Sequence, residues 1–493
     1  MKPTTLLHAL AAMILSAVGA PACGGPIVAP LAYGPVTPAP EEPFRARAPE
    51  ASPPEPAVLP PWRVTKLGNG LRVALLERHA LPVVALRLEI DRGAADTGAD
   101  HGTIGLLQAM LGAGTTARTA PALAAAYAEL GAVHGGGAGT DGCMLSAKVG
   151  AADLDAALGL LAESATQPRF TAEAFNGARA RWAQDLVNTT YVPGAVVQRN
   201  AAALLFGHAH AYGYVRPSAG RVADERVGDI AAIHASLFQP AHATLLVVGD
   251  ATPEAVDAIV ARRLGDWRAV AAPPPRAPAP PPPPDGPRVV LIESANQADT
   301  VVAVLARGPA AADPDALALA VLARAIGGHS SHLREELREE RGAAYTFGAG
   351  LVAFRSASFV VLGGPLAADK AAAGLRAELS AVMSAGALGV GEADLARART
   401  SLVAEWRSVV ATTDGLTRLA ADAIACGEPL EWVATYPARV AAVTGADVRR
   451  VAQRYLRRDA LRVVVLGDRR LRGELEMLGL GPVGRRDEWA DPL

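Results

Sequence analysis

The sequence predicts an α+β fold in which two similar halves each consist of a mostly antiparallel sheet with helices packed on one face. Three observations indicate this fold. Two proline-rich stretches divide the 493 residues into candidate folded segments. Within these segments, β-branched runs typical of strands and Ala/Leu-rich runs typical of helices do not alternate strictly. The ends of the two segments also repeat each other in register.

The repeat is clearest at the end of each half. The first half ends in RVGDIAAIHASLFQPAHATLLVVGD and the second in TGADVRRVAQRYLRRDALRVVVLGD. The same number of positions separates Asp229 from Asp447 and Gly249 from Gly467. Each unit predicts an amphipathic helix followed by a buried strand. The two halves also begin alike, with two predicted strands followed by a long helix.

Composition sets the domain boundaries. Polyproline enters neither a helix interior nor a central strand, so the Pro-rich stretches predict a tether and a semi-rigid linker. The chain is therefore expected to contain a signal peptide (1–22), a Pro/Ala-rich tether (23–61), an N-terminal domain (62–270), a polyproline linker (271–287), a C-terminal domain (288–475) and a tail (476–493).

The N-terminus predicts export. Lys2 is followed by an apolar run and by the small residues Ala20 to Ala22, as in a secretory signal peptide. Cys23 comes next, and this arrangement resembles a bacterial lipoprotein site, at which the cysteine is acylated. The protein is therefore expected to be either periplasmic or a membrane-anchored lipoprotein. Only Cys143 and Cys426 remain after Cys23, which excludes a disulfide framework and a Cys-based zinc site.

Charge and composition exclude other classes. The net charge is −2, and Lys and Arg are scattered along the chain rather than gathered in a basic stripe. We therefore expect no nucleic acid partner. Hydrophobic residues make up 51% of the chain but aromatic residues only 4%, so the cores must be built mainly from Ala, Val and Leu.

Several segments of the first half resemble one peptidase family. In order they are LGNGLRVALLERHALPVVALRLEIDRG, HGTIGLLQAMLGAGT, ELGAVHGGGAGTDGCMLSAKVG, HAHAYGYVRPSAG and QPAHATLLVVGD. They resemble the pitrilysin/insulinase family of zinc peptidases, which includes mitochondrial processing peptidase, and the resemblance extends over residues 62–475. It implies two homologous metallohydrolase domains, of the kind found in LuxS and mitochondrial processing peptidase, that form half of a clamshell.

The family carries H-x-x-E-H on the helix within GTIGLLQAMLGAGT. Residues at i, i+3 and i+4 share one helical face, where two imidazoles bind Zn²⁺ and the Glu deprotonates the bound water. Here the positions hold Gly105, Gln108 and Ala109, which supply neither ligands nor a general base. Near the downstream ligand position we find Gln184 and Asp185 but no Glu. We expect no catalytic residue, no metal site and no bound cofactor in this chain.

The histidines do not replace the missing ligands. None combines helical ligand spacing with a nearby carboxylate base, so all are expected to be surface or loop residues. Six of the ten histidines are the candidates for such a replacement: His101, His134, His208, His210, His329 and His332.

The second half carries a better-preserved motif. GGHSSHLREELREERGAAYTFGAG resembles the family's G-G-x-S-S-R-L…L-R-E-x-x-G-L-x-Y, with His332 and Ala343 as departures. Arg338 and Tyr345 stand at the family spacing. The resemblance implies that this pair reaches the zinc site of the other half or of a partner, where it binds substrate backbone and steadies the scissile carbonyl.

Local sequence predicts where this pair lies. SSHLREELREER predicts a helix with Ser330 or Ser331 as its N-cap and Gly342 at its end. Arg338 is then expected in the last helical turns and Tyr345 early in the next strand. Charge pattern alone would favour a solvated helix face, but the family motif favours a substrate-binding pair.

These features predict a non-catalytic, substrate-binding subunit of a heterodimeric, exported zinc peptidase. Its partner would be an active insulinase-family subunit that carries H-x-x-E-H and the Zn²⁺, and its substrates would be peptides paired with a sheet edge. One alternative is a peptidase-derived scaffold or peptide-binding protein without a proteolytic role. A weaker alternative is a hydrolase that uses other ligands.

Overall fold

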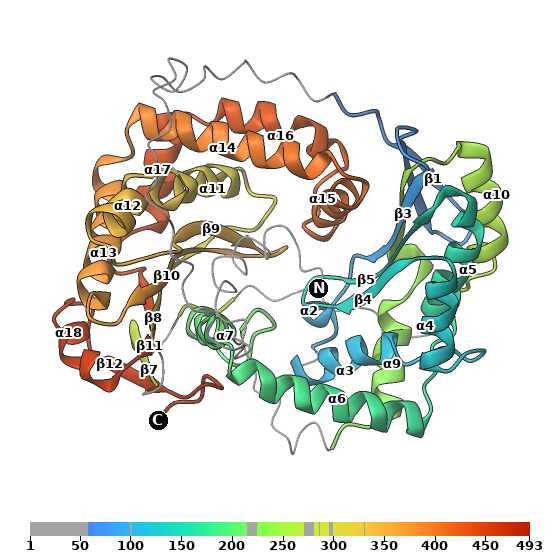
Figure 1. The fold of residues 1–493 in the computed structure, drawn as a ribbon, viewed down its shortest axis with the longest axis horizontal. Coiled ribbons are helices and arrows are strands. Elements are labelled where there is room, and N and C mark those ends of the chain that lie inside the picture. The colour runs from blue at the N-terminus through green and yellow to red at the C-terminus, as the bar shows by residue number, and fades with distance from the viewer. Residues whose placement is uncertain are drawn as a thin grey trace, which may run out of the picture.

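The structure is a computed structural model. It describes residues 58–98, 101–213, 224–270, 281–284, 286–294, 299–329 and 331–493. The predicted signal peptide, Cys23 and most of the tether and linker lie outside these residues. Figure 1 shows two lobes, each built on a sheet.

The first sheet has the strand order β1-β2-β6-β3-β5-β4. Only β2 and β6 run parallel, and the other neighbours pair antiparallel. The β-branched run of the repeat forms β6, which is buried throughout. The strands are β1 Arg63–Lys66, β2 Arg72–Glu77, β3 Val83–Ile90, β4 Val133–Ala138, β5 Cys143–Gly150 and β6 Ala243–Gly249.

The second sheet has the order β12-β7-β11-β8-β10-β9. From β7 to β9 it repeats the order from β2 to β4 in the first sheet, as the sequence repeat predicts. The edge strand β12 comes from residues 476–493, so the expected tail is wrong in this part: it completes the sheet. The strands are β7 Val289–Glu293, β8 Asp299–Gly308, β9 Gly348–Ala353, β10 Ser358–Ala367, β11 Arg462–Gly467 and β12 Val483–Arg486.

The described helices surround both sheets. Those of the first half are α2 Ala94–Thr97, α3 His101–Leu111, α4 Ala120–Glu129, α5 Leu154–Thr166, α6 Ala172–Thr190, α7 Pro193–Phe206, α9 Val227–Leu237 and α10 Pro253–Leu264. Those of the second half are α11 Pro314–Gly327, α12 His332–Glu335, α13 Ala371–Leu388, α14 Glu392–Val410, α15 Thr413–Ala425, α16 Glu431–Ala442, α17 Gly445–Tyr455 and α18 Arg472–Glu476.

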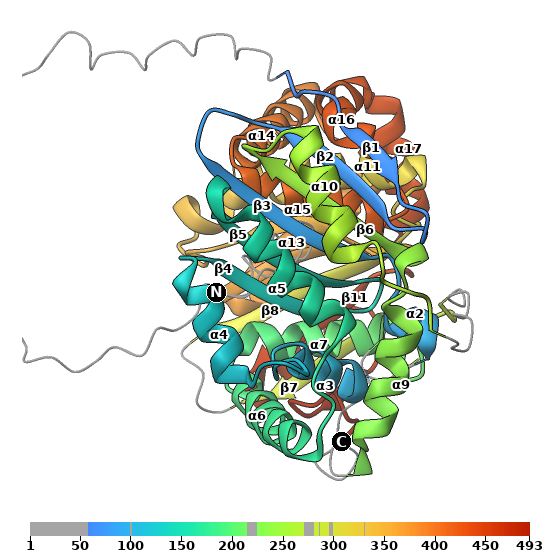
Figure 2. The same ribbon diagram turned by 90° about the vertical axis from the view of Figure 1, so that its right-hand side faces the viewer.

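Each sheet packs its own helices on one face. In the first half α3, α5, α9 and α10 form a core with the sheet, and Figure 2 shows α5 and α10 lying across it. In the second half α11, α13 and α17 do the same. This arrangement agrees with the α+β fold that the sequence predicts.

The opposite face of each sheet is covered by a helix from the other half. Helix α15 packs on β3 and β6 of the first sheet, and α7 packs on β8 and β11 of the second. No sequence pattern predicted this exchange. It buries the second face of both sheets and therefore joins the two halves into one unit.

A polar network between two hairpin turns also joins the halves. Arg355, in the β9–β10 turn, donates to the Asp96 carboxylate at 2.7 Å, and its backbone N–H donates to Asp141 in the β4–β5 turn at 2.8 Å. The Tyr212 hydroxyl lies 3.0 Å from an Asp141 carboxylate oxygen and 2.6 Å from the Ser356 hydroxyl. Asp96 is only 2% exposed, and Arg355 is the closer of its two cations, the other being Arg92 at 3.8 Å.

Glu378 on α13 is a buried carboxyl group that makes the stability of the second half depend on pH. It is fully buried, and neither carboxylate oxygen has a hydrogen-bond partner among the described residues. Burial raises the pKa of this carboxyl well above 4.5. The folded state therefore keeps a proton that the unfolded state loses above about pH 4.5, and stability falls as pH rises from there, by up to about 1.4 kcal/mol per unit.

We predict that Glu378→Met raises the free energy of unfolding at pH 7 by about 1–3 kcal/mol and removes this pH dependence. Glu378→Gln should also remove the pH dependence but gain less, because it leaves a buried amide. Urea unfolding at several pH values measures both effects. A less stable Met variant with an unchanged pH profile would contradict the prediction.

Candidate functional site

Helix α3 keeps the frame of the family's zinc-binding helix. Leu106, Leu107 and Met110 are fully buried in the first core and Leu111 is 5% exposed. The apolar side of the helix is therefore intact, although the zinc-ligand and general-base positions have lost their functional groups.

The position of the first zinc ligand is occupied by a tryptophan. A Cβ atom on Gly105 would lie 2.1 Å from Cζ2 of Trp182 on α6, so any side chain at position 105 meets the indole. The indole N–H is buried and has no hydrogen-bond acceptor among the described residues. Gly105 supplies no ligand, as expected, and its missing side chain makes room for Trp182.

The remaining residues do not fit a zinc ion either. Gln108 and Ala109 lie one turn along α3, and Gln184 donates to Asn188 on α6 at 3.1 Å. Among the described residues there is no group of three or more His, Cys, Asp or Glu side chains that could hold a metal. A family-type zinc centre does not fit the residues of this chain.

We predict that Gly105→Ala destabilises the protein by about 1–3 kcal/mol through overpacking, although alanine favours a helix by about 1 kcal/mol. In a Trp182→Leu background the same change should be neutral or stabilising. Gly177→Ala on α6 is the matched control, because its Cβ would meet only Arg181 at 3.5 Å, and it should stabilise. Equal effects of Gly105→Ala in both backgrounds would exclude the Trp182 contact.

The described histidine side chains have local protein contacts. His134 packs edge-on against Tyr127, and the Tyr212 N–H donates to His210 Nδ1 at 3.1 Å. His329 Nδ1 lies 2.6 Å from the Arg334 guanidinium, and His332 Nε2 lies 3.6 Å from Asp394. The structure brings no two of these four together.

The segment that carries Arg338 is helical, as predicted. The Ser331 hydroxyl caps α12 by accepting from the Arg334 N–H at 3.2 Å. A π-helical turn, Glu336–Glu340, then extends α12, and it ends before Gly342, whose φ of +52° is left-handed. π-Helical turns are rare and occur often at functional sites.

Arg338 and Tyr345 are brought together. The Arg338 guanidinium carbon lies 5.3 Å from the centroid of the Tyr345 ring, and the ring is 79% exposed. Arg338 is also exposed and pairs with its neighbour Glu339 at 3.2 Å, a contact worth little in solvent. Tyr345 lies in a bend three residues before β9, not in a strand as predicted. The direction of its side chain is therefore not set by the alternation of side chains along a strand.

The pair does not reach α3 of its own chain. Figure 1 shows α12 at the outer side of the second half and α3 in the first half. The zinc-helix position and the Arg/Tyr pair are therefore two separate sites in one chain.

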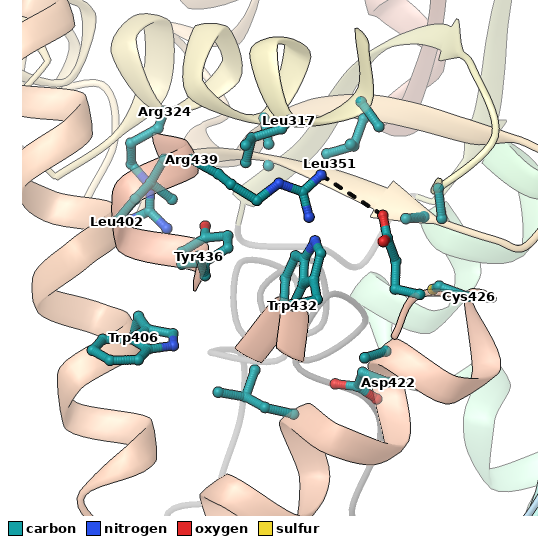
Figure 3. Close-up of a pocket in the computed structure, with 18 of the residues that line it drawn as sticks. Leu317, Arg324, Leu351, Leu402, Trp406, Asp422, Cys426, Trp432, Tyr436 and Arg439 are labelled. Atoms are coloured by element: carbon teal, nitrogen blue, oxygen red, sulfur yellow. Dashed lines mark ion pairs between the residues drawn. The ribbon is translucent and has the colours of Figure 1, made fainter. Parts of the chain in front are cut away.

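Two further candidate binding surfaces, a strand edge and a cavity, are not marked by any sequence motif. Strand β4 is an edge of the first sheet, and none of its residues is buried. A cavity also lies in the second half between β9, α11, α14, α15 and α16 (Figure 3). Its walls combine three consecutive helices with α11 and β9 from earlier in the chain, so no local pattern could predict it.

Two family models match this chain. Insulinase (Peptidase family M16) matches residues 72–211, and the Peptidase M16 inactive domain matches residues 226–402. A search of curated proteins found no match.

Solved structures share the fold. A peptidase M16 inactive domain from Pseudomonas fluorescens is 21% identical, covers 83% of this chain and 98% of its own, and has a TM-score of 0.74. A protease from Helicobacter pylori is 21% identical, covers 83% of this chain and 100% of its own, and has a TM-score of 0.74. The periplasmic protease PqqL from Escherichia coli is 16% identical and covers 85% of this chain and 47% of its own, with a TM-score of 0.69.

The repeated sheet-and-helix halves and the altered α3 positions define a non-catalytic, peptidase-like protein. The matched models together cover more than half of the residues. The chain belongs to the insulinase family, peptidase family M16. Among its described helices, none has the length and apolar character needed to cross a membrane.

Proposed function

We propose that this chain is the substrate-binding subunit of a heterodimeric, exported zinc peptidase. Its partner is a family member with an intact H-x-x-E-H motif, which holds the Zn²⁺ and activates water. The observation that carries the proposal is the exposed Arg338/Tyr345 pair in a chain whose own ligand position is filled by Trp182.

The chemistry of the pair supports this role. A guanidinium offers a rigid fork of donors, and a phenol offers one O–H donor. Fixed donors of this kind stabilise the negative charge that develops on a scissile carbonyl oxygen. Because Tyr345 is 79% exposed and the pair is remote from α3, the group it serves belongs to another subunit.

A peptide substrate also needs a surface to hold its backbone. β4 pairs with β5 on one side, and no other described strand pairs with it. Such an edge offers backbone N–H and C=O groups to an extended peptide. The β4 edge also favours the second candidate function, a peptide-binding protein without proteolysis.

Export is part of the same proposal. The first 22 residues have the composition of a signal peptide, and Cys23 is the candidate for acylation in a lipoprotein. The likeness of the fold to a periplasmic protease supports an extracytoplasmic site of action.

Co-expression with an H-x-x-E-H family member tests the assembly. We expect a 1:1 complex in sedimentation or mass photometry, with no such complex when the partner is an unrelated periplasmic protein. A chain that binds peptides but forms no complex with any intact family member would support the second candidate and exclude the first.

A further inference from the structure

The cavity in the second half is a site of a different kind. Its volume is about 140 Å³, close to the roughly 150 Å³ of an engineered apolar cavity that accepts benzene. Its walls come from β9 and helices α11, α14, α15 and α16, away from both α3 and the Arg338/Tyr345 pair. Most of the wall is apolar, including Leu317, Leu351, Leu402, Leu419, Trp406 and Trp432.

Unused hydrogen-bond donors line this apolar space. The Trp406 indole donates to the Val433 carbonyl at 2.8 Å, but the Trp432 indole and the Tyr436 hydroxyl have no hydrogen-bond partner among the described residues. Burial raises the pKa of Tyr436, so its hydroxyl stays protonated. Figure 3 shows the Trp432 indole nitrogen directed toward the Arg439 guanidinium. A neutral apolar ligand would leave these donors unused.

Arg439 is available for an anion. Its only ion pair among the described residues is with Glu428 at 3.9 Å, the outer limit of such a contact. By contrast, Arg324 on the same wall is held by Glu405 at 2.5 Å. The Arg439 side chain is 38% exposed and lies 5.7 Å from the Trp432 ring centroid, at the rim of the cavity.

We propose that this cavity binds a small carboxylate with an apolar body about the size of benzene. The body fills the space between Leu317, Leu402 and Trp432, and the carboxylate accepts from Arg439 at the rim. Two sources share this chemistry: a free aromatic acid, and the C-terminal residue of a peptide. The inference does not depend on the peptidase partner.

Titration of the full chain with phenylacetate and with the neutral phenylacetamide tests the proposal. We expect phenylacetate to bind roughly tenfold or more tightly than the amide, because a hydrogen bond to a charged group is worth about 1.4 kcal/mol or more. Arg439→Met should remove this preference. Glu428→Gln should tighten phenylacetate binding, because it removes the competing anion. Calorimetry or ligand-observed NMR measures each affinity.

Matched variants keep the test specific. Ala320→Leu fills the cavity and should abolish binding of both probes, whereas Arg472→Met makes the same change as Arg439→Met in an exposed pair on α18 and should alter neither. Equal affinity for the two probes, no binding of phenylacetate, or unchanged binding by Ala320→Leu would overturn the proposal.

A third probe distinguishes a free aromatic acid from a peptide C-terminus as the ligand. A tripeptide that ends in phenylalanine with a free carboxylate is compared with its amidated form. Tighter binding of the free peptide than of phenylacetate assigns the site to peptide C-termini. Weaker binding assigns it to free acids.

Discussion

Replacing Arg338 by alanine and Tyr345 by phenylalanine is expected to lower kcat/KM of the assembled heterodimer by roughly 10²–10³-fold. The loss should fall mainly on kcat, because donors that meet a developing oxyanion act in the transition state more than in the ground state. Steady-state cleavage of a fluorogenic peptide by the complex measures it.

The control variants change a tyrosine and an arginine that are exposed but lie outside the pair. Tyr191 is 80% exposed, almost the same as Tyr345, and Tyr191→Phe should leave kcat/KM unchanged. Arg376→Ala removes another exposed arginine, which pairs with Glu474 at 3.5 Å, and should also be silent. Assembly of the double variant is checked by its mass. Full activity of an assembled Arg338→Ala/Tyr345→Phe complex would exclude the proposed role of the pair.

The second large effect is on stability. Arg355→Met should lower the free energy of unfolding by about 3–5 kcal/mol, because it removes the closest cation of the buried Asp96 carboxylate and leaves only Arg92, at 3.8 Å. Arg355 also donates to the Asp91 carbonyl at 3.0 Å, so the change removes both side-chain contacts of Arg355 with the first half, while its backbone bond to Asp141 remains. Chemical denaturation of the purified chain measures the loss.

A double-mutant cycle separates this ion pair from lost packing. Asp96→Asn removes the charge that Arg355 compensates, so Arg355→Met should cost much less in that background. Arg472→Met, in an exposed pair with Glu476 on α18, should change stability by less than about 1 kcal/mol. Additive losses in the cycle would show that the pair is not coupled.

Local pattern predicted much of the fold. The β-branched runs became β6 and β11, and the helices before them became α9 and α17, because strand and helix periodicities are encoded within a few residues. In α17 the Thr444 hydroxyl accepts from the Asp447 N–H at 3.2 Å, so even the capping residue is visible in sequence.

Local patterns did not predict contacts between residues that are far apart in the chain. α7 and α15 each carry an apolar face that could cover either sheet, and only the tertiary structure shows that each covers the sheet of the other half. Strand β12 is short and lies beyond the sequence repeat, so no pattern predicted it. Trp182 lies far along the chain from Gly105, and no spacing rule links them.

The local structure around the candidate pair was predicted only in part. The motif named Arg338 and Tyr345, and the cap at Ser331 and the end at Gly342 agree with the structure. The bend that holds Tyr345 outside β9 and the π-helical turn under Arg338 depend on packing, which the motif does not encode.

We propose that this chain holds no zinc of its own and completes the site of a partner that does. The most direct test measures zinc content and peptide cleavage for the chain alone, for an H-x-x-E-H partner alone, and for their mixture. We expect no stoichiometric zinc and no cleavage for this chain alone, and activity with zinc in the mixture well above that of the partner alone. Stoichiometric zinc and chelator-sensitive cleavage by this chain alone would contradict the proposal.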